Sequence, residues 1–434
     1  MKTKNIIKIS IAIILIIAIA LTCFLIFGPK TIQGSDFPTI FVHGMSGWGS
    51  YDKRYEETPY FGLTSGDILK SLNNRGYEVY AASVGPYSSA WDRACELYAQ
   101  LTGTVVDYGI YHSSKYGHAQ YGEDYTGKAL MGDYVWDSEN KVNLVGHSFG
   151  GITIRLMEDL LADGSEEEVQ ASEAAGVEPS PLFTGDKADM VFSITTIAAP
   201  SNGSTSVYLS SDASSLYDSD CFQAHLEQFG ISSDGSESSS TVMTKMSQSG
   251  YWDHNDNCLV DMTVDRACAI NETIEMQPDV FYMSYYGETT TVDSSGKSVA
   301  SESTSKYMSD NANAMGQYSS STPGSYVDGY GSYLSTVSAP VQTLGTEWQA
   351  NDGLVNVISA KCPFHVSSDG DRIYDSNTEY SDGTVFEPGT WYIMPKTTYD
   401  HLQIIGGIFD TDGTTLRAMY IDMMDKIYSF TMKK

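Results

Sequence analysis

The pentapeptide Gly146-His147-Ser148-Phe149-Gly150 constrains the fold of this chain more than any other feature. It lies directly after an apolar stretch, residues 141–145, and directly before a helical pattern that begins near Gly151. A turn from strand to helix this tight accepts only small residues two positions either side of the serine. The alternative is a glycine-rich turn with an incidental serine, and the flanking strand and helix patterns argue against it. The pattern therefore predicts a strained Ser148 with its hydroxyl at the carboxyl end of a buried strand.

Short apolar or β-branched stretches alternate with helical patterns along the chain. The predicted strands are Thr39–His43, Glu78–Val84, Lys141–Gly146, Met190–Ala198, Val280–Tyr286 and Leu354–Ser359. The predicted helices are Ser65–Leu72, Ala90–Leu101, Gly151–Leu161 and Thr415–Tyr428. Strands that alternate with helices indicate an α/β architecture with a largely parallel central sheet.

Two polar regions interrupt this alternation. Ser204–His254 is rich in Ser and Asp with scattered apolar residues, and it is predicted to be a mobile lid or an insertion. Thr289–Tyr326 is dominated by Ser, Thr, Gly and Asn, which predicts a long, flexible, polar excursion. The sequence contains no internal repeat.

The N-terminus has the pattern of a membrane or export signal. Lys2, Lys4 and Lys8 precede an almost unbroken apolar run, Ile9–Phe27, which as a helix would be about 28 Å long, close to the hydrocarbon thickness of a bilayer. The basic flank retains that end in the cytoplasm, so the rest of the chain is expected to be exported. An uncleaved signal anchor is the first interpretation, and a cleaved signal peptide with a secreted mature form is the second. Residues 1–34 are thus expected to be the anchor or signal with a short linker, and residues 35–434 a single domain.

Charge and cysteine content set further limits. The chain has 25 basic and 55 acidic residues, a formal net charge of −30, which repels nucleic acid and anionic membrane surfaces. Export permits disulfides, but the chain is no disulfide-rich scaffold, because only five cysteines follow the apolar run. Their odd number leaves at least one thiol free; they are Cys95, Cys221, Cys258, Cys268 and Cys362.

A nucleophilic serine that attacks a carbonyl needs donors for the oxyanion that forms. The backbone N–H of Phe149, directly after the serine, is one candidate. The second is the N–H of Met45, because Phe41-Val42-His43-Gly44-Met45 ends the first strand and Gly44 allows a sharp turn. An ordinary strand-ending turn is the alternative for this loop on its own.

The serine also needs a base, and histidine has a suitable pKa. On a fold of this kind the chain order is serine, acid, histidine, which leaves His225, His254, His365 and His401. Spacing keeps His365 and His401 in competition. Asp352, on a turn just before the strand predicted from Leu354, is the candidate acid, although it has many acidic rivals.

The chain resembles the staphylococcal and thermophilic-bacillus lipases (bacterial lipase family I.5) over nearly everything from Pro38 onward. So many ordered matches are more specific than any single motif. The resemblance implies an α/β-hydrolase fold with a helical lid and a zinc-binding insertion. It also implies Ser148, Asp352 and His401 as the catalytic triad. The matching stretches are Phe41–Gly44, Gly47–Gly49, Val84–Ser89, Trp91–Glu96, Val106–Gly109, Lys115–His118, Leu144–Ser148, Ser180–Phe183, Thr195–Ala198, Asn351–Asn356 and Asp400–Leu402.

The resemblance further implies a structural Zn²⁺ held by two Asp and two His. Carried onto this sequence, its ligands are Asp92, His112, His118 and Asp261. By sequence alone, two histidines six residues apart in a Gly/Tyr-rich loop are more often surface residues. Nitrogen and carboxylate oxygen suit zinc, and four protein ligands make a closed site.

These lipases usually also bind Ca²⁺ near the catalytic histidine, through a Glu two residues after it and an Asp-Pro pair beyond. Here Gln403 replaces the Glu, and Ile408-Phe409 stands where the pair is expected. Asp410 and Asp412 are out of register, so a calcium site is predicted to be absent or altered.

Together these features predict an extracytoplasmic triacylglycerol lipase that acts on a lipid or ester substrate through an acyl-enzyme. A short-chain carboxylesterase or phospholipase is the alternative within enzymes. A catalytically silent surface protein on a hydrolase scaffold is the alternative outside them.

Overall fold

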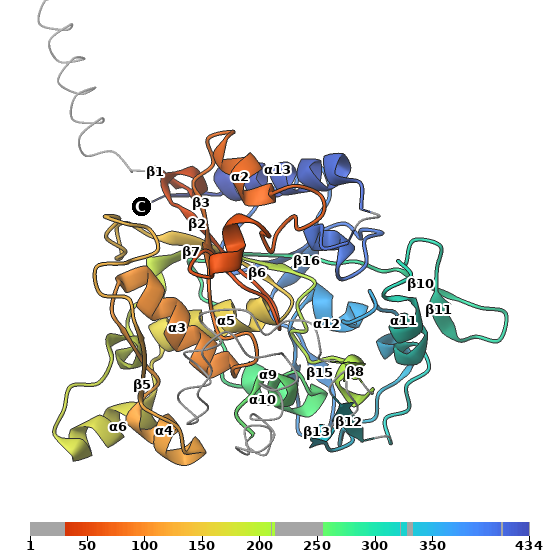
Figure 1. Ribbon diagram of the computed structural model, residues 1–434, viewed down its shortest axis with the longest axis horizontal. Helices are drawn as coiled ribbons and strands as arrows, with labels where there is room; N and C mark the ends of the chain where they lie inside the picture. The colour runs from red at the N-terminus through yellow and green to blue at the C-terminus, as the bar shows by residue number, and fades with distance from the viewer. Residues whose placement is uncertain are drawn as a thin grey trace, which may run out of the picture.

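A seven-stranded sheet forms the centre of the molecule, and each neighbouring pair of its strands is parallel (Figure 1). The computed structural model describes residues 31–209, 211–212, 255–321, 323–327, 333–408 and 411–433. Five of the six predicted strands belong to this sheet, with ends within two residues of those predicted. In spatial order the strands are β16 (Asn377–Glu379), β17 (Trp391–Ile393), β9 (Phe281–Tyr285), β7 (Val191–Ile197), β6 (Val142–His147), β2 (Thr39–Val42) and β3 (Val79–Ala82).

Helices cover both faces of the sheet, as a buried parallel sheet requires. Side chains of β2 show the alternation: Ile40 and Val42 join one hydrophobic core, and Phe41 joins the other. The four predicted helices are confirmed. On one face lie α3 (Ala90–Thr102) and α5 (Phe149–Ala162), and on the other lie α2 (Ile68–Asn73) and α13 (Gly413–Ser429) (Figure 1).

The sixth predicted strand, Leu354–Ser359, is wrong. The chain instead forms a turn around Asp352, closed by an antiparallel bridge between Asn351 and Asn356, and then the short helix α12 (Val357–Lys361). The Asn356 side chain anchors the turn by donating to Thr205 Oγ1 and to a backbone carbonyl. A short apolar run does not distinguish a buried strand from a buried helix, which explains the error.

The prediction of a flexible excursion after Thr289 is also wrong. Residues 290–300 form a hairpin of β10 (Thr290–Val292) and β11 (Ser298–Ala300), and α11 (Ser309–Met315) follows. The N–H of Thr289 donates to the carbonyl of Asn351, and the Asn311 side chain donates to that of Gly353, so this segment is bonded to the turn that carries Asp352. Of the other polar region, the structure describes a 3₁₀ turn at Thr205–Tyr208 and little more. The predicted lid therefore lies mostly outside the described residues.

Smaller elements surround the sheet. β1 (Thr31–Gln33) pairs with β18 (Thr431–Lys433), so the two ends of the described chain lie side by side (Figure 1). In the described ranges the remaining α-helices are α4 (Ile110–Tyr116), α6 (Glu166–Ala175), α9 (Cys258–Asp261) and α10 (Val264–Asn271). The remaining strands are β4 (Val105–Asp107), β5 (Tyr121–Asp124), β8 (Ser211–Asp212), β12 (Gly324–Val327), β13 (Tyr333–Val337), β14 (His365–Val366) and β15 (Arg372–Ile373).

The predicted anchor, Ile9–Phe27, lies outside the described residues. Among those that are described, no helix has the length and apolar character needed to cross a membrane. The four cysteines in the described part of the chain, Cys95, Cys258, Cys268 and Cys362, are buried free thiols.

Candidate active site and metal centre

Ser148 sits on the turn between β6 and α5 in a strained backbone conformation, with φ 54° and ψ −129°. The two flanking glycines are required by close backbone contacts. A Cβ on Gly146 would lie 2.4 Å from the carbonyl oxygen of Gly150, and a Cβ on Gly150 would lie 2.4 Å from that of Val42. The turn therefore holds the serine at the carboxyl end of a central strand, as the pentapeptide predicts.

Ser148, His401 and Asp352 form a continuous chain of hydrogen bonds. His401 Nε2 lies 2.9 Å from Ser148 Oγ, and His401 Nδ1 lies 2.9 Å from Asp352 Oδ2. The second oxygen of Asp352 accepts from the N–H groups of Leu354 and Val355, at 3.0 and 2.7 Å. All three side chains are buried: their residues are 7%, 3% and 1% exposed. Such a chain orients an imidazole to accept a proton from the serine.

The competing histidine, His365, lies elsewhere. It is on β14, half-buried, and its Nε2 is 3.5 Å from Asp375. Of the histidines that remained open in the sequence, His225 and His254 fall outside the described residues. Among those described, the structure brings His401 to the serine.

The two predicted oxyanion donors are Phe149, directly after Ser148, and Met45, directly after Gly44. Phe149 is the first residue of α5, and the N–H groups of a helix's first turn have no intrahelical acceptor. Gly44 lies against the serine, because a Cβ there would be 2.6 Å from Ser148 Cβ. The next residue, Met45, thus lies in a loop that contacts the candidate nucleophile.

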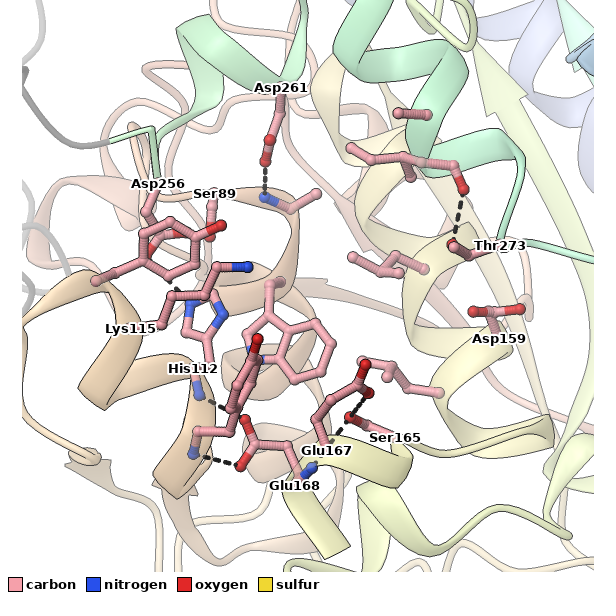
Figure 2. A pocket seen from close by; sticks show the side chains of 18 of the residues that line it. Ser89, His112, Lys115, Asp159, Ser165, Glu167, Glu168, Asp256, Asp261 and Thr273 are labelled. Carbon is pink, nitrogen blue, oxygen red and sulfur yellow. Dashed lines mark hydrogen bonds and ion pairs between the residues drawn. The ribbon is translucent and has the colours of Figure 1, made fainter. Parts of the chain in front are cut away.

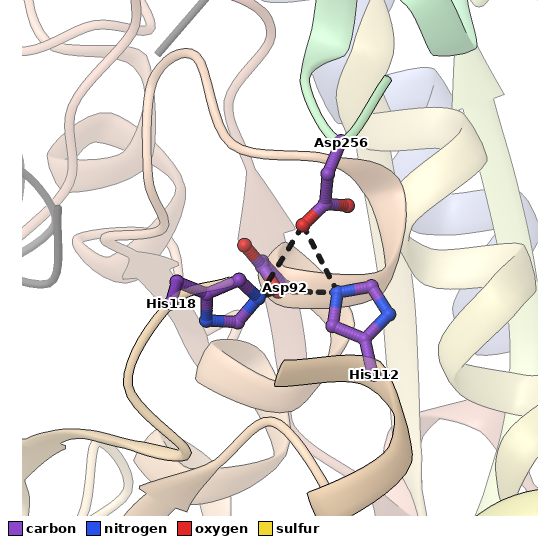
Figure 3. Close-up of side chains that lie close together, drawn as sticks. All are labelled: Asp92, His112, His118 and Asp256. Carbon is purple, nitrogen blue, oxygen red and sulfur yellow. Dashed lines mark hydrogen bonds and ion pairs between the residues drawn. The ribbon is translucent and has the colours of Figure 1, made fainter. Parts of the chain in front are cut away.

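A second group of titratable side chains converges away from the serine. Asp92 comes from the first turn of α3, His112 from α4, His118 from the loop after α4, and Asp256 from the segment before α9 (Figure 3). All four residues are buried, and one ligand atom from each lies within 4.8 Å of all the others. In the described part of the chain, this is the group of His, Cys, Asp and Glu able to hold a metal ion.

The spacing of these ligand atoms suits a tetrahedral ion. His112 Nε2 is 3.1 Å from both Asp92 Oδ1 and Asp256 Oδ2, and His118 Nε2 is 4.0 and 3.4 Å from the same two oxygens. A tetrahedral zinc with ligands at about 2.0 Å places them about 3.3 Å apart. His118 Nδ1 donates to the carbonyl of Ala119 at 2.9 Å, which leaves the Nε2 lone pair for a metal.

The electrostatics of the group also favour a cation. Burial by itself would lower the pKa of His112, but hydrogen bonds to Asp256 and Asp92 outweigh this and raise the pKa to about 10. Burial and the neighbouring carboxylate of Asp256 raise the pKa of Asp92. Two buried carboxylates thus require a positive charge between them, which a divalent ion supplies when bound.

The structure does not bring Asp261, the fourth ligand predicted from the sequence, into this group. Asp261 is the last residue of α9, and its carboxylate points away from His112 toward a backbone N–H (Figure 2). That N–H belongs to Ala90, 2.8 Å away, and the carboxylate also pairs with Arg266 at 3.2 Å. It therefore caps the N-terminus of α3 from outside the ligand group. Asp256 occupies the fourth position instead.

A cavity of about 350 Å³ adjoins the ligand group of Asp92, His112, His118 and Asp256 (Figure 2). It lies between α4, α5, α6 and α10. His112 and Asp256 lie at one end of it, and Asp159 lies at the other. Trp91 stacks on the His112 ring with 5.1 Å between the ring centroids, so an aromatic wall fixes the orientation of this imidazole.

Residues expected near a calcium ion have protein partners. Gln403 Oε1 accepts from the N–H of Asp400 at 2.8 Å, and the Asp412 carboxylate caps α13 by accepting from Thr414 N and Thr415 Oγ1. Phe409 and Asp410 fall outside the described residues. That a calcium site is absent or altered remains a prediction.

The parallel sheet, the strained serine turn and the buried Ser–His–Asp arrangement define an α/β-hydrolase. Comparison with known proteins narrows this class. The family model for the lipase-like C-terminal domain matches residues 35–339. The chain is 32% identical to a lipase of Staphylococcus epidermidis over 383 residues, and 32% identical to lipase 2 of Staphylococcus aureus over 388 residues. Each match covers 85% of this chain and 50% of the relative, so the chain spans about half the length of these curated relatives.

Comparison with solved structures gives the same result as comparison with the curated sequences. The lipase of Staphylococcus hyicus superposes with a TM-score of 0.70 at 30% identity, covering 91% of this chain and 95% of that one. EstA of Clostridium botulinum gives a TM-score of 0.72 at 30% identity, covering 92% and 88%. The chain belongs to the staphylococcal-type family of bacterial lipases, which confirms the resemblance read from its motifs.

Proposed function

We propose that this protein is an extracytoplasmic lipase that hydrolyses carboxylic esters of acylglycerols, with Ser148, His401 and Asp352 as its catalytic triad. The observation that carries the proposal is the hydrogen-bonded chain from Ser148 Oγ through the His401 ring to the Asp352 carboxylate, 2.9 Å at each link. Membership of a lipase family supports the same reaction class.

In the proposed mechanism, His401 accepts the proton of Ser148 as Oγ attacks the ester carbonyl. The backbone N–H groups of Met45 and Phe149 stabilise the oxyanion. Asp352 orients the imidazole and stabilises the imidazolium. His401 then protonates the leaving alcohol, and a water activated by the same base releases the fatty acid from Ser148.

In this proposal a zinc ion would be held by Asp92, His112, His118 and Asp256. Four protein ligands leave no open position, so the ion would cross-link α3, α4 and the segment before α9 without entering the reaction. The residues from 35 onward would then form one lipase domain with lid and zinc-binding insertions. The predicted segment Ile9–Phe27 would direct this domain across the membrane, either as an anchor or as a cleaved signal.

The test is hydrolysis of p-nitrophenyl esters of short and long chain by the wild type, Ser148→Ala and two histidine variants. We expect Ser148→Ala and His401→Ala to lose nearly all turnover and His365→Ala, the matched control, to retain it. A fluorophosphonate should label the wild type and not Ser148→Ala. Retained hydrolysis in Ser148→Ala would refute the assignment of the nucleophile.

The same assay separates the alternatives. Activity that rises sharply when a long-chain substrate forms an interface is expected of a lipase. Turnover restricted to soluble short-chain esters would identify a carboxylesterase, and failure of the wild type to react with the fluorophosphonate would identify a silent scaffold. Fractionation of expressing cells, with and without residues 1–34, tests the proposed location.

A further inference from the structure

A buried tyrosine hydroxyl links two segments of the candidate active site. They are the loop that carries Gly44 and Met45, here called the oxyanion loop, and the turn that carries His147 and Ser148, here called the nucleophile turn. Tyr60 Oη accepts from the N–H of Gly44 at 3.1 Å and lies 2.8 Å from His147 Nδ1. Gly44 directly precedes Met45, and His147 directly precedes Ser148. Tyr60 is itself buried and packs edge-on against Trp48 and Phe61. Its hydroxyl thus touches the backbone of one candidate catalytic loop and the side chain of another.

The Tyr60 hydroxyl and the His147 ring each have a defined protonation state. Burial raises the pKa of Tyr60 far above its usual value, so the hydroxyl keeps its proton. Burial, together with His401 and His43 nearby, holds the pKa of His147 well below its usual range, so its ring is neutral. Because the N–H of Gly44 donates to Tyr60, the tyrosine proton is available to donate to His147 Nδ1.

The peptide group between Gly44 and Met45 is also held by a side-chain hydrogen bond. His43 Nε2 accepts from the N–H of Val84 at 3.2 Å, so Nδ1 carries the ring proton and donates to the carbonyl of Gly44 at 2.8 Å. That carbonyl belongs to the same peptide group as the N–H of Met45. Tyr60 and His43 therefore fix the two successive peptide planes that set where the Met45 N–H points.

We propose that Tyr60 is a positioning residue, whose hydroxyl aligns the oxyanion loop with the nucleophile turn by holding Gly44 and His147 together. The proposal rests on the proposed function, because it assigns Tyr60 a role in the reaction of Ser148. His147 extends the link toward the base, since its ring centroid lies 4.8 Å from that of His401. The hydroxyl touches no reacting atom, and its effect is on the geometry of the donors.

The test is Tyr60→Phe, which removes only the hydroxyl. We expect kcat for a p-nitrophenyl ester to fall roughly ten-fold or more, with KM within about two-fold, because misaligned donors weaken binding of the transition state and not of the ester. The affinity of an alkylboronic acid, whose adduct with the serine is tetrahedral, should fall by a similar factor. The melting temperature of each variant reports its stability separately.

Tyr420→Phe is the matched control. Tyr420 is buried in the same hydrophobic core, and its hydroxyl donates to the carbonyl of Ile404 at 3.1 Å. We expect it to lower the melting temperature while kcat and boronate affinity stay near those of the wild type. A Tyr60→Phe variant that loses stability but keeps the wild-type kcat and boronate affinity would overturn the proposal.

A second variant tests the contact between the Tyr60 hydroxyl and His147. His147→Leu removes the acceptor, and it should also lower kcat with little change in KM. If the two act through one link, the double variant loses less than the product of the single losses. Fully multiplicative losses would overturn the link, whereas a wild type without Ser148-dependent hydrolysis would overturn the proposed function first and this role with it.

Discussion

The backbone N–H of Ser305 donates a hydrogen bond of 2.8 Å to the buried carboxylate of Asp400, the residue directly before His401. The other carboxylate oxygen accepts from the N–H groups of Leu402 and Gln403, at 3.1 and 2.9 Å. The hairpin and α11 segment, residues 289–316, is thereby tied to the loop of the proposed base. Its Asn311 side chain also donates to the carbonyl of Gly353, beside Asp352. This polar segment therefore contacts both loops that carry the proposed acid and base, Asp352 and His401.

Asp400→Ala is expected to destabilise the protein and misplace His401. It leaves three backbone donors without their acceptor, and each such loss costs about 1–3 kcal/mol. We expect a melting temperature several degrees below that of the wild type and a lower kcat. The control is Asp293→Asn in the hairpin turn of the same segment, where the amide oxygen can still accept from the N–H groups of Ser295 and Lys297. Equal melting temperatures for Asp400→Ala and Asp293→Asn would contradict this structural role of Asp400.

Asp256 and Asp261 provide a paired test of the metal centre. Asp256→Asn should abolish tight zinc binding, because it removes one of the four ligands, while Asp261→Asn should retain zinc. An ion present at about 1,000 times its Kd stabilises the folded state by roughly 4 kcal/mol, so a chelator should lower the melting temperature of the wild type. Zinc content by atomic absorption and melting curves with and without chelator measure both effects.

Two outcomes would count against this assignment. Zinc retained by Asp256→Asn and lost by Asp261→Asn would restore the ligand set expected from the sequence. A wild type whose melting temperature does not respond to the chelator would show that the site does not stabilise the fold. Asp261→Asn should still lose some stability through its weakened cap on α3.

Five strands of the sheet were predictable because they are almost entirely buried and therefore rich in apolar and β-branched residues. β16 and β17 escaped detection, since Asn377–Glu379 is exposed and Trp391–Ile393 is only three residues long. Leu354–Ser359 was misassigned because its conformation depends on polar contacts of the Asn356 side chain, among them one with Thr205, which is distant in sequence. The order of residues 289–321 likewise depends on contacts such as Ser305 with Asp400, which composition does not encode.

Some residues of the candidate site were likewise predictable from the sequence, and others were not. Ser148 was fixed by its local context, whereas the choice of His401 over His365 needed the family resemblance or the fold. Asp256 was missed although a signal existed: Asn257 caps α9 with its side chain, which places Asp256 outside the helix and free to reach the ligand group. Tyr60 carried no signal, because its two partners lie 16 and 87 residues away in sequence.

Glu158 should make stability depend on pH. Burial raises its pKa to about 8, although the Tyr282 hydroxyl and Arg155 act to lower it. Between the unfolded value near 4.5 and about 8, the folded state holds a proton that the unfolded state has lost. The contribution of Glu158 to the free energy of unfolding therefore falls as pH rises through this window, by about 1.4 kcal/mol per unit, and is constant above it.

Glu158→Gln removes this titration. Urea unfolding at pH 5, 6.5 and 8 should show a shallower fall for Glu158→Gln than for the wild type. The exposed residue Glu166 provides the control, since Glu166→Gln should follow the wild-type dependence. Parallel curves for wild type and Glu158→Gln would refute the role of this carboxyl group.

Gly44→Ala tests how closely the oxyanion loop must approach the serine. The added methyl group would lie 2.6 Å from Ser148 Cβ and 3.1 Å from Ser148 Oγ. Because the strained turn holds Ser148 in place, the loop must retreat and carry the Met45 N–H with it. We expect kcat/KM for a p-nitrophenyl ester to fall about 100-fold, and fluorophosphonate labelling of the serine to slow in parallel. Gly407→Ala, where the nearest atom to the new methyl is 3.2 Å away, is the control and should retain most activity. A Gly44→Ala variant with wild-type turnover would show that the loop does not need this close contact.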